Sequence, residues 1–238
     1  MPGILKIKRI LITGIISLNK NFNLNKNIFL TGGSSGIGRE LTLELSKKNN
    51  VFFTYLNNYK SAKVIKKKSI KKSYIFKLDL SSRDKIKNCV LQLKKKLPII
   101  NLVILNACKP AKRIPFKSLT IREIKEKIKI NYLGNLILIK EILHLYKNCY
   151  GKLKIVHISS DVVKKGGWNL CHYSPLKSAI DNLFLCLDRE YLNRIKFISV
   201  KIGSTNTPGY KYGNKLNSKT KSVQFTKKKI LKLINISN

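Results

Sequence analysis

A glycine-rich turn between an apolar run and an amphipathic segment restricts the fold of this chain more than any other feature. The run Ile28–Leu30 leads into Thr31-Gly-Gly-Ser-Ser-Gly-Ile-Gly38, and a helix-like segment begins near Glu40. A strand that ends in such a turn and starts a helix presents free backbone N–H groups and the positive end of a helix dipole, which together suit a pyrophosphate. An ordinary strand-to-helix turn has the same composition, so this interpretation depends on the rest of the chain.

Strand-like and helix-like segments alternate along the chain. The pattern predicts strands near 28–31, 51–55, 74–78, 101–106, 153–159 and 196–202. It predicts helices near 36–48, 60–68, 82–96, 120–147 and 172–193. Pro175 falls in the first turn of the last helix, where a missing N–H costs little. Short crossovers between parallel strands favour a doubly wound, three-layer α/β/α fold with ligands at the carboxyl ends of the strands.

Several motifs, in their order and spacing, resemble the short-chain dehydrogenase/reductase family. The glycines follow the TGxxxGxG spacing of that family rather than GxGxxG. Asn106-Ala-Cys108 closes the apolar run Leu102–Leu105 and resembles the family's Asn-Ala-Gly with its glycine replaced. Tyr173 and Lys177 form a Tyr-x-x-x-Lys pair, and Ser160 precedes Tyr173 by thirteen positions, as the family usually has.

Three further positions extend the resemblance from about residue 28 to about residue 207. Asp79 stands where the family has an acid that hydrogen-bonds the adenine. Asn131 resembles the catalytic asparagine on the helix beside the sheet. Ile202-Gly-Ser-Thr-Asn-Thr207 resembles the Pro-Gly-x-x-x-Thr that follows the sixth strand, with isoleucine in place of proline. Together these motifs imply a Rossmann-like, NAD(P)-binding oxidoreductase.

The resemblance implies catalytic roles for Asn131, Ser160, Tyr173 and Lys177. A tyrosine with its ordinary pKa near 10 is a poor proton donor and acceptor at neutral pH. A lysine four residues later lies on the same helical face, so we expect its ammonium to favour the phenolate. Ser160 would polarise the substrate oxygen, Lys177 would also bond the ribose hydroxyls, and Asn131 would hold a water that relays protons.

The residues implied in cofactor binding follow the same motifs. They are Gly32, Ser34, Ser35, Gly36, Ile37, Gly38, Tyr55, Asn57, Asp79, Leu80, Asn106, Ala107, Tyr173, Lys177, Gly203, Thr205 and Thr207. Members that prefer NAD place an acid after the second strand, where it repels a 2′-phosphate. Positions 55–58 are Tyr, Leu, Asn and Asn, and the first charge nearby is Lys60, so NADP is favoured over NAD.

Five of these residues have structural alternatives. Asn57, or Asn58 beside it, would bond a 2′-phosphate or would form only a turn. Tyr173 and Lys177 would otherwise be a surface pair on an amphipathic helix. Asn106 would otherwise form a turn at the strand end, and Asp79 would be the N-cap of the segment that begins at Ser81. For Asn106 and Asp79 the sequence supports the two interpretations equally.

Other polar residues near the motifs are interpreted without a role in chemistry. Ser159 either shares the hydroxyl role of Ser160 or satisfies the backbone. His157 and His172 flank the expected site and are interpreted, with His144, as packing or surface residues. The three have no metal-ligand spacing, so we expect no metal.

Composition limits the partners and the compartment. The net charge is +38, from 49 Lys and Arg against 11 Asp and Glu, which raises the question of nucleic-acid binding. The cations are mostly lysine and are spread along the whole chain, which favours a solvated surface over a specific nucleic-acid interface. Five scattered cysteines without a C-x-x-C pair indicate a reducing, cytoplasmic compartment. No apolar run approaches the roughly 18 residues that a membrane span requires.

The two ends of the chain depart from the family. We expect a basic leader or extra strand over 1–27, the dinucleotide-binding catalytic domain over 28–208, and a flexible lysine-rich tail with one helix over 209–238. The leader contains the strand-like run Arg9–Gly14, which resembles the start of the enoyl-thioester reductase branch, although a targeting peptide is the alternative. The tail has a Gly/Asn/Lys-rich stretch at 209–221 and a helical run at 225–235, but no convincing seventh strand. It forms either a mobile loop over the site or an incomplete substrate pocket.

The resemblance therefore implies an NADP-preferring oxidoreductase that transfers a hydride between nicotinamide and a carbonyl or alcohol. Among substrates we favour a 3-oxoacyl thioester of fatty-acid synthesis, because a basic surface would suit an acidic carrier protein; a homo-oligomer is also allowed. Enoyl-thioester reduction is one alternative. A degenerate dinucleotide-binding module that contacts RNA or a partner protein is another, and the replacements Cys108 and Ile202 keep it open.

Overall fold

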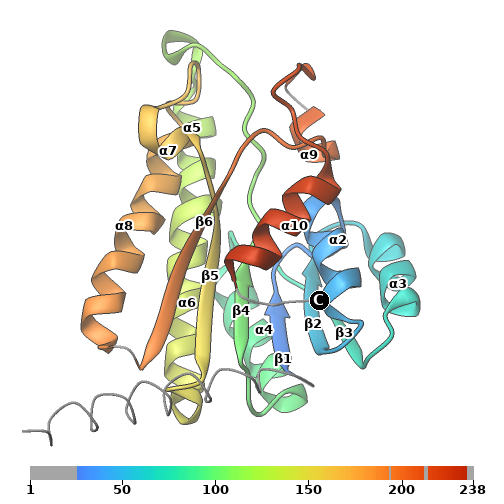
Figure 1. Ribbon diagram of the computed structural model, residues 1–238. Helices are drawn as coiled ribbons and strands as arrows, with labels where there is room; N and C mark the ends of the chain where they lie inside the picture. The colour runs from blue at the N-terminus through green and yellow to red at the C-terminus, as the bar shows by residue number, and fades with distance from the viewer. Residues whose placement is uncertain (1–25, 193, 212–213, 235–238) are drawn as a thin grey trace, which may run out of the picture.

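The computed structural model describes residues 26–192, 194–211 and 214–234 and contains a single six-stranded sheet there. The strands are β1 Asn27–Leu30, β2 Asn50–Tyr55, β3 Ser73–Lys77, β4 Leu102–Leu105, β5 Leu153–Ser160 and β6 Ile195–Ile202. They are parallel and lie in the order β3-β2-β1-β4-β5-β6 (Figure 1). This order confirms the doubly wound α/β fold, with its switch point between β1 and β4.

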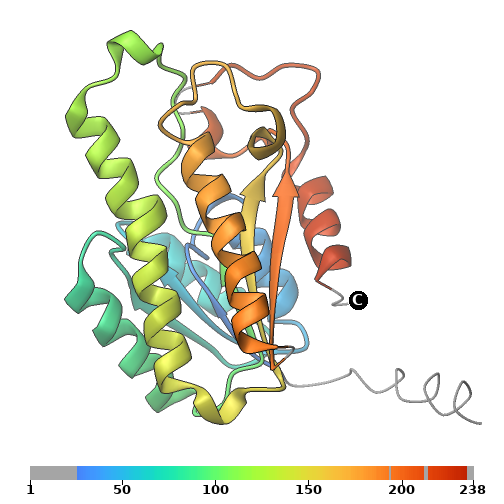
Figure 2. The same ribbon diagram turned by 90° about the vertical axis from the view of Figure 1, so that its left-hand side faces the viewer.

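Helices cover both faces of the sheet. The longer ones are α2 Gly36–Leu45, α3 Tyr59–Lys68, α4 Arg83–Lys96, α5 Ile121–Lys127, α6 Gly134–Leu145, α8 Ser174–Tyr191 and α10 Val223–Leu233. Short helices are η1 Phe116–Ser118, η3 Lys147–Cys149, α7 Val162–Lys165 and α9 Pro208–Lys211. Helices α4, α6 and α8 pack on one face, whereas α2, α3 and α10 pack on the other. Figure 2 shows α6 and α8 on their face and α10 on the opposite side.

Burial of the central strands explains their composition. The residues of β1 after Asn27 and all residues of β4 are at most 2% exposed. A strand covered by helices on both faces reads as a continuous apolar run rather than an alternating one. These two strands therefore form the rigid centre of the sheet, and their carboxyl ends lie at the switch point.

The helix predicted over 120–147 is interrupted in the structure. A π-helical turn, η2 Ile128–Leu133, separates α5 from α6 and contains Asn131. The side-chain amide of Asn135 donates to the carbonyl of Asn131 at 3.1 Å, which satisfies a group that the π turn frees. Such turns are rare and occur often at functional sites.

The alternative interpretation of Asp79 as an N-cap is wrong. Ser82 is the N-cap of α4, and its hydroxyl accepts from the backbone N–H of Lys85. Asp79 instead accepts from the N–H and the hydroxyl of Ser81, at 2.9 and 2.6 Å. Pro175 lies in the first turn of α8, as predicted.

Helix α10 of the expected tail packs onto the domain. Ile230 and Leu231 are 0% and 5% exposed and join the core cluster that contains Val200 of β6. The Lys227 ammonium pairs with the Glu44 carboxylate of α2 at 2.9 Å. This helix therefore covers the face of the sheet next to β6.

Two expectations about the ends concern residues that the structure does not describe or only partly describes. Residues 1–25 of the expected leader, with Arg9–Gly14, lie outside the described residues, whereas Asn27 belongs to β1. The helical run predicted to residue 235 is described to 234. Within the described ranges, no strand pairs with the outer edge of β6. In the same ranges no helix has the length and apolarity needed to cross a membrane.

Candidate active site

The glycine turn adopts a backbone that requires glycine. Gly36 has φ of +52°, in the left-handed region that side chains disfavour. A Cβ on Gly38 would lie 2.1 Å from the carbonyl oxygen of Gly32, so only glycine lets α2 begin this close to the turn. Packing and backbone conformation therefore explain why glycine occupies positions 36 and 38.

The start of α2 has groups that suit an anion. Ser35 is the N-cap, yet its side chain makes no capping hydrogen bond, and the first turn contains no acid. The first N–H groups of a helix have no partner within the helix, and they carry the positive end of its dipole. Ser34 is buried, whereas Ser35 is exposed and Ile37 packs against the core. The residues present therefore fit a dinucleotide pyrophosphate.

Asn106 joins the carboxyl ends of β1 and β4. Its side-chain amide donates to the carbonyls of Thr31 and Gly32 at 2.9 and 3.2 Å. The backbone N–H groups of Asn106 and Ala107 both donate to the Thr31 hydroxyl at 3.0 Å. Asn106 thus holds the glycine turn in place, which makes it a structural member of the expected cofactor site.

The residues expected near the adenosine follow β2 and β3. Tyr55 packs against Tyr59, with ring centres 5.5 Å apart. Asn58 caps α3 by accepting from Ser61 N–H at 2.8 Å, whereas Asn57 is exposed and makes no such bond. Lys60, three residues later, is also exposed.

Asp79 and Leu80 occupy the next strand end. Hydrogen bonds from Ser81 lower the pKa of Asp79, and Lys85 adds a smaller effect. Leu80 is buried, and its carbonyl lies 2.2 Å from where a Cβ on Gly134 would stand, so α6 approaches this strand end closely.

The loop after β6 crosses the glycine turn. The Thr207 side chain lies 3.3 Å from where a Cβ on Gly36 would stand. Thr205 is buried and bonds the hydroxyl of Thr226 in α10 at 2.9 Å, which anchors the loop. Gly203, which follows the last residue of β6, is exposed. The structure thus brings Thr207 to the expected cofactor site and gives Thr205 a partner in α10.

The expected catalytic pair lies at the start of α8. The Lys177 ammonium is 5.9 Å from the ring centre of Tyr173. Ser160 ends β5 and is half-buried, and the hydroxyl of Ser174 donates to the carbonyl of Val162 at 2.9 Å, which ties the start of α8 to the segment after β5. The Tyr173 hydroxyl makes no hydrogen bond to the described part of the chain.

The electrostatics of this pair differ from the expectation. Burial raises the pKa of Tyr173, and the neighbouring Cys108 thiol adds to this effect. Burial also lowers the pKa of Lys177. Its ammonium donates to the Ile158 carbonyl at 2.7 Å and meets His157 Nε2 at 3.3 Å. The predicted lowering of the Tyr173 pKa by Lys177 is therefore not found, because burial dominates.

Asn131 binds the backbone of the loop after β4. Its amide oxygen accepts from Lys109 N–H at 2.7 Å, and its amide nitrogen donates to the Lys109 carbonyl at 3.2 Å. The π turn places this side chain against the loop that carries Cys108. Asn131 has no hydrogen bond to Lys177 among the described residues.

Two polar residues near the expected catalytic pair were not predicted from the sequence to have a role there. Lys127, four residues before Asn131, is buried, donates to the carbonyls of Lys109 and Pro110, and has a pKa lowered to about 8, chiefly by burial. His157 is not merely a packing residue, because it contacts Lys177. A histidine between the buried apolar residues Val156 and Ile158 of β5 was the signal that could have indicated this contact.

Comparison with known proteins agrees with this geometry. Residues 26–216 match the profile of the family described as short chain dehydrogenase. The chain belongs to the short-chain dehydrogenase family. Membership confirms the resemblance to this family stated above.

Individual relatives of this short-chain dehydrogenase are distant. It is 26% identical over 199 residues to 3-ketodihydrosphingosine reductase of Mus musculus, covering 79% of this chain and 59% of that protein. It is 27% identical over 186 residues to 3-oxoacyl-[acyl-carrier-protein] reductase FabG of Buchnera aphidicola, covering 78% and 73%. The solved structure of an ElxO variant with NADPH bound matches with a TM-score of 0.78 at 22% identity, covering 90% and 92%.

The match covers only part of the length of several curated relatives. It spans 53 to 65% of the length of five curated proteins that it matches. At 22% identity, the likeness to ElxO shows the fold alone. Family and fold are thus established, whereas the substrate has to be argued from the site.

Proposed function

We propose that this short-chain dehydrogenase uses NADPH to reduce the ketone of a 3-oxoacyl thioester. The observation that carries the proposal is the meeting of Tyr173 and a buried lysine, Lys177, at the carboxyl edge of the sheet that also carries the glycine turn. A bound nicotinamide supplies the hydride. The protein's own groups then have to orient the ketone and deliver one proton to its oxygen.

Tyr173 is the proton donor in this proposal. The phenol is protonated at neutral pH, and in this proposal it gives that proton to the carbonyl oxygen as the hydride adds to carbon. Because burial raises the pKa of Tyr173 and so makes it a weaker acid, the positive charge of Lys177 has to offset burial as the phenolate forms. Ser160 donates a hydrogen bond to the same oxygen and fixes its direction. The Lys177 ammonium stabilises the phenolate that remains until it is protonated again from solvent. Asn131 fixes the loop that carries Cys108 beside this pair.

The choice of NADPH rests on the residues after β2. No acid occupies positions 55–58, where a carboxylate would repel a 2′-phosphate. Asn57 and Lys60 are exposed at this edge and supply an amide donor and a cation. These features support NADP over NAD.

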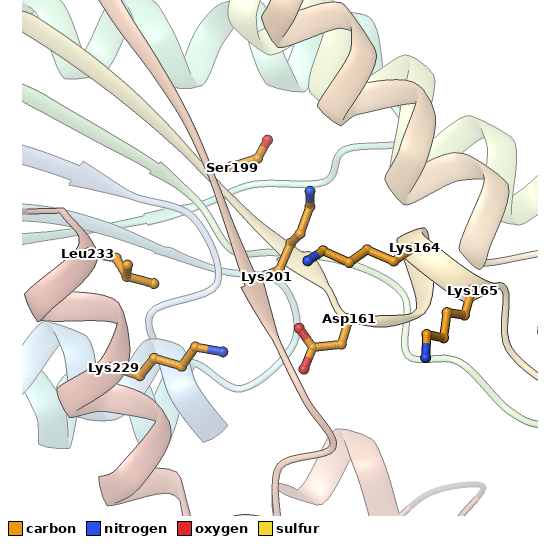
Figure 3. A pocket seen from close by; sticks show the side chains of 7 residues that line it. All are labelled: Asp161, Lys164, Lys165, Ser199, Lys201, Lys229 and Leu233. Carbon is orange, nitrogen blue, oxygen red and sulfur yellow. The ribbon is translucent and has the colours of Figure 1, made fainter.

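The substrate class rests on two kinds of support. The relatives include reductases named for a 3-keto and for a 3-oxoacyl group. A hollow of about 480 Å³ also lies along the outer edge of β6, and the residue that follows Ser160, Asp161, is among those that line it (Figure 3). Its lining is Asp161, Lys164, Lys165, Ser199, Lys201, Lys229 and Leu233.

Four lysines from three elements line this hollow. Lys164 reaches from α7 toward Lys201 of β6, and Lys229 reaches toward the same strand from α10 (Figure 3). Like charges gathered this way favour an anionic partner. An acidic or phosphate-bearing carrier of the acyl group fits this surface.

The five cysteines are free thiols, which supports a reducing compartment such as the cytoplasm.

The test follows NADPH absorbance with a 3-oxoacyl thioester on a carrier protein, beside the same thioester on a short synthetic thiol. Tyr173→Phe should lower kcat by at least about 1000-fold and leave NADPH affinity within about threefold. Lys164→Gln with Lys201→Gln should raise KM for the carrier-bound substrate but not for the small one. NADPH binding without turnover on any carbonyl would favour a non-catalytic module. Turnover of an enoyl but not an oxoacyl thioester would favour alkene reduction.

A further inference from the structure

A chain of hydrogen bonds extends behind Lys177, away from Tyr173. The Lys177 ammonium meets His157 Nε2 at 3.3 Å, His157 Nδ1 meets an Asp181 carboxylate oxygen at 3.1 Å, and the Ser159 hydroxyl donates to the other oxygen at 2.8 Å. Lys177 and His157 are 5% and 2% exposed. The chain joins the middle of β5 to one face of α8, where Lys177 and Asp181 are four residues apart.

The partners of His157 determine which ring nitrogen carries the proton. An ammonium group has only donors, so Nε2 has to accept from Lys177. Nδ1 then carries the hydrogen and donates it to Asp181. Burial, followed by the charge of Lys177, lowers the pKa of His157 to about 4 against the opposing effect of Asp181. His157 is therefore neutral at physiological pH and acts as a fixed acceptor.

The same contacts orient the Lys177 ammonium. Two of its three protons go to the Ile158 carbonyl and to His157, which leaves one for the side where Tyr173 lies. A buried ammonium loses its hydration, and burial lowers the pKa of Lys177, whereas Cys108 and, to a smaller extent, Asp181 oppose that change. The titratable groups that face Lys177 are Tyr173 and Asp181 of α8, His157 of β5 and Cys108 after β4.

We propose that His157 and Asp181 are positioning residues that hold the Lys177 ammonium charged and aimed toward Tyr173. His157 supplies the acceptor, and Asp181 fixes its tautomer and supplies the negative charge, without either residue touching the substrate. The inference rests on the proposed function, because Lys177 matters to catalysis only through Tyr173 and the nucleotide. A purely structural role would instead rest on the contact of the His157 ring with Phe184, whose centres are 6.0 Å apart.

The first test needs no substrate. Because the chain has three histidines, a long-range ¹H–¹⁵N spectrum resolves each ring, and His144→Gln and His157→Gln assign them. His157 should show the neutral Nδ1–H form from pH 8 to pH 5.5. Lys177→Met should raise the pKa of His157, since a neighbouring positive charge is removed. An Nε2–H tautomer, or a ring protonated at pH 6, would overturn the proposal.

The second test separates positioning from packing. NADPH affinity, read from its fluorescence between pH 6 and 10, should fall at high pH as Lys177 loses its proton. Asp181→Asn keeps the shape of the side chain and should move this fall toward acid by about one pH unit. Asp188→Asn removes an exposed carboxylate from the same helix and should leave the curve in place.

The outcomes of the two proposals can be told apart. If Asp181→Asn and Asp188→Asn give the same curve as the unmodified protein, the positioning role fails even where oxoacyl turnover is found. If the curve moves as expected and no carbonyl substrate is reduced, the proposed function fails and the positioning of Lys177 at the nucleotide site stands.

Discussion

Acidification should destabilise this protein through His157 well before its carboxylates are protonated. The pKa of this ring is lowered from 6.5 to about 4 by burial and by Lys177. Between these two values the unfolded chain binds one proton more than the folded chain at this site. The free energy of unfolding must therefore decrease as the pH falls through this window.

The size of the effect follows from the shift. One pKa unit corresponds to about 1.4 kcal/mol, so the full window is worth about 3 kcal/mol, of which about 2 kcal/mol is lost between pH 7 and pH 5. His157→Gln retains a donor and an acceptor but cannot titrate. It should be less stable at pH 7, and its stability should depend less on pH by that amount.

Urea denaturation followed by circular dichroism at pH 7, 6 and 5 gives the measurement. The difference in unfolding free energy between the two proteins should shrink by about 2 kcal/mol from pH 7 to pH 5. His144→Gln, at an exposed histidine, serves as the matched control. Equal losses in the unmodified protein and in His157→Gln would refute the reasoning, because they would mean that His157 titrates alike in both states.

Three further predictions concern the packing around the site. Gly134→Ala places a Cβ 2.2 Å from the Leu80 carbonyl, a backbone atom that cannot move aside, and should lower the unfolding free energy by about 2 kcal/mol or more in a urea titration. Ile230→Ala removes a side chain that is 0% exposed and should cost about 2 to 4 kcal/mol by the same measurement, whereas a freely moving C-terminal helix would show no change. Glu44→Gln weakens the 2.9 Å pairs with Lys227 and Lys47 and should lower Tm by an amount equivalent to about 1 kcal/mol, less at high salt.

Local signals predicted most of the fold. The predicted strands agree with β1 to β6 to within one or two residues, because apolar runs and the turns that bound them are local. The glycine turn likewise predicted where α2 begins, and Pro175 predicted where α8 begins. The interruption at Asn131 had no such signal, since that π turn is stabilised by contact with Lys109, 22 residues earlier in the chain.

Some features of the candidate site can likewise be predicted from the sequence, whereas others depend on tertiary contacts. The order and spacing of Ser160, Tyr173 and Lys177 can be read directly from the chain, so the amino-acid sequence was enough to identify them as candidates for the proposed reaction. The surroundings of these residues could be seen in the folded protein alone. The tertiary structure set His157 of β5 against Lys177 and Asp181 of α8, and it buried them together. A pKa depends on burial and on charges a few ångströms away, and those are properties of strands and helices that meet in space rather than of neighbours along the chain.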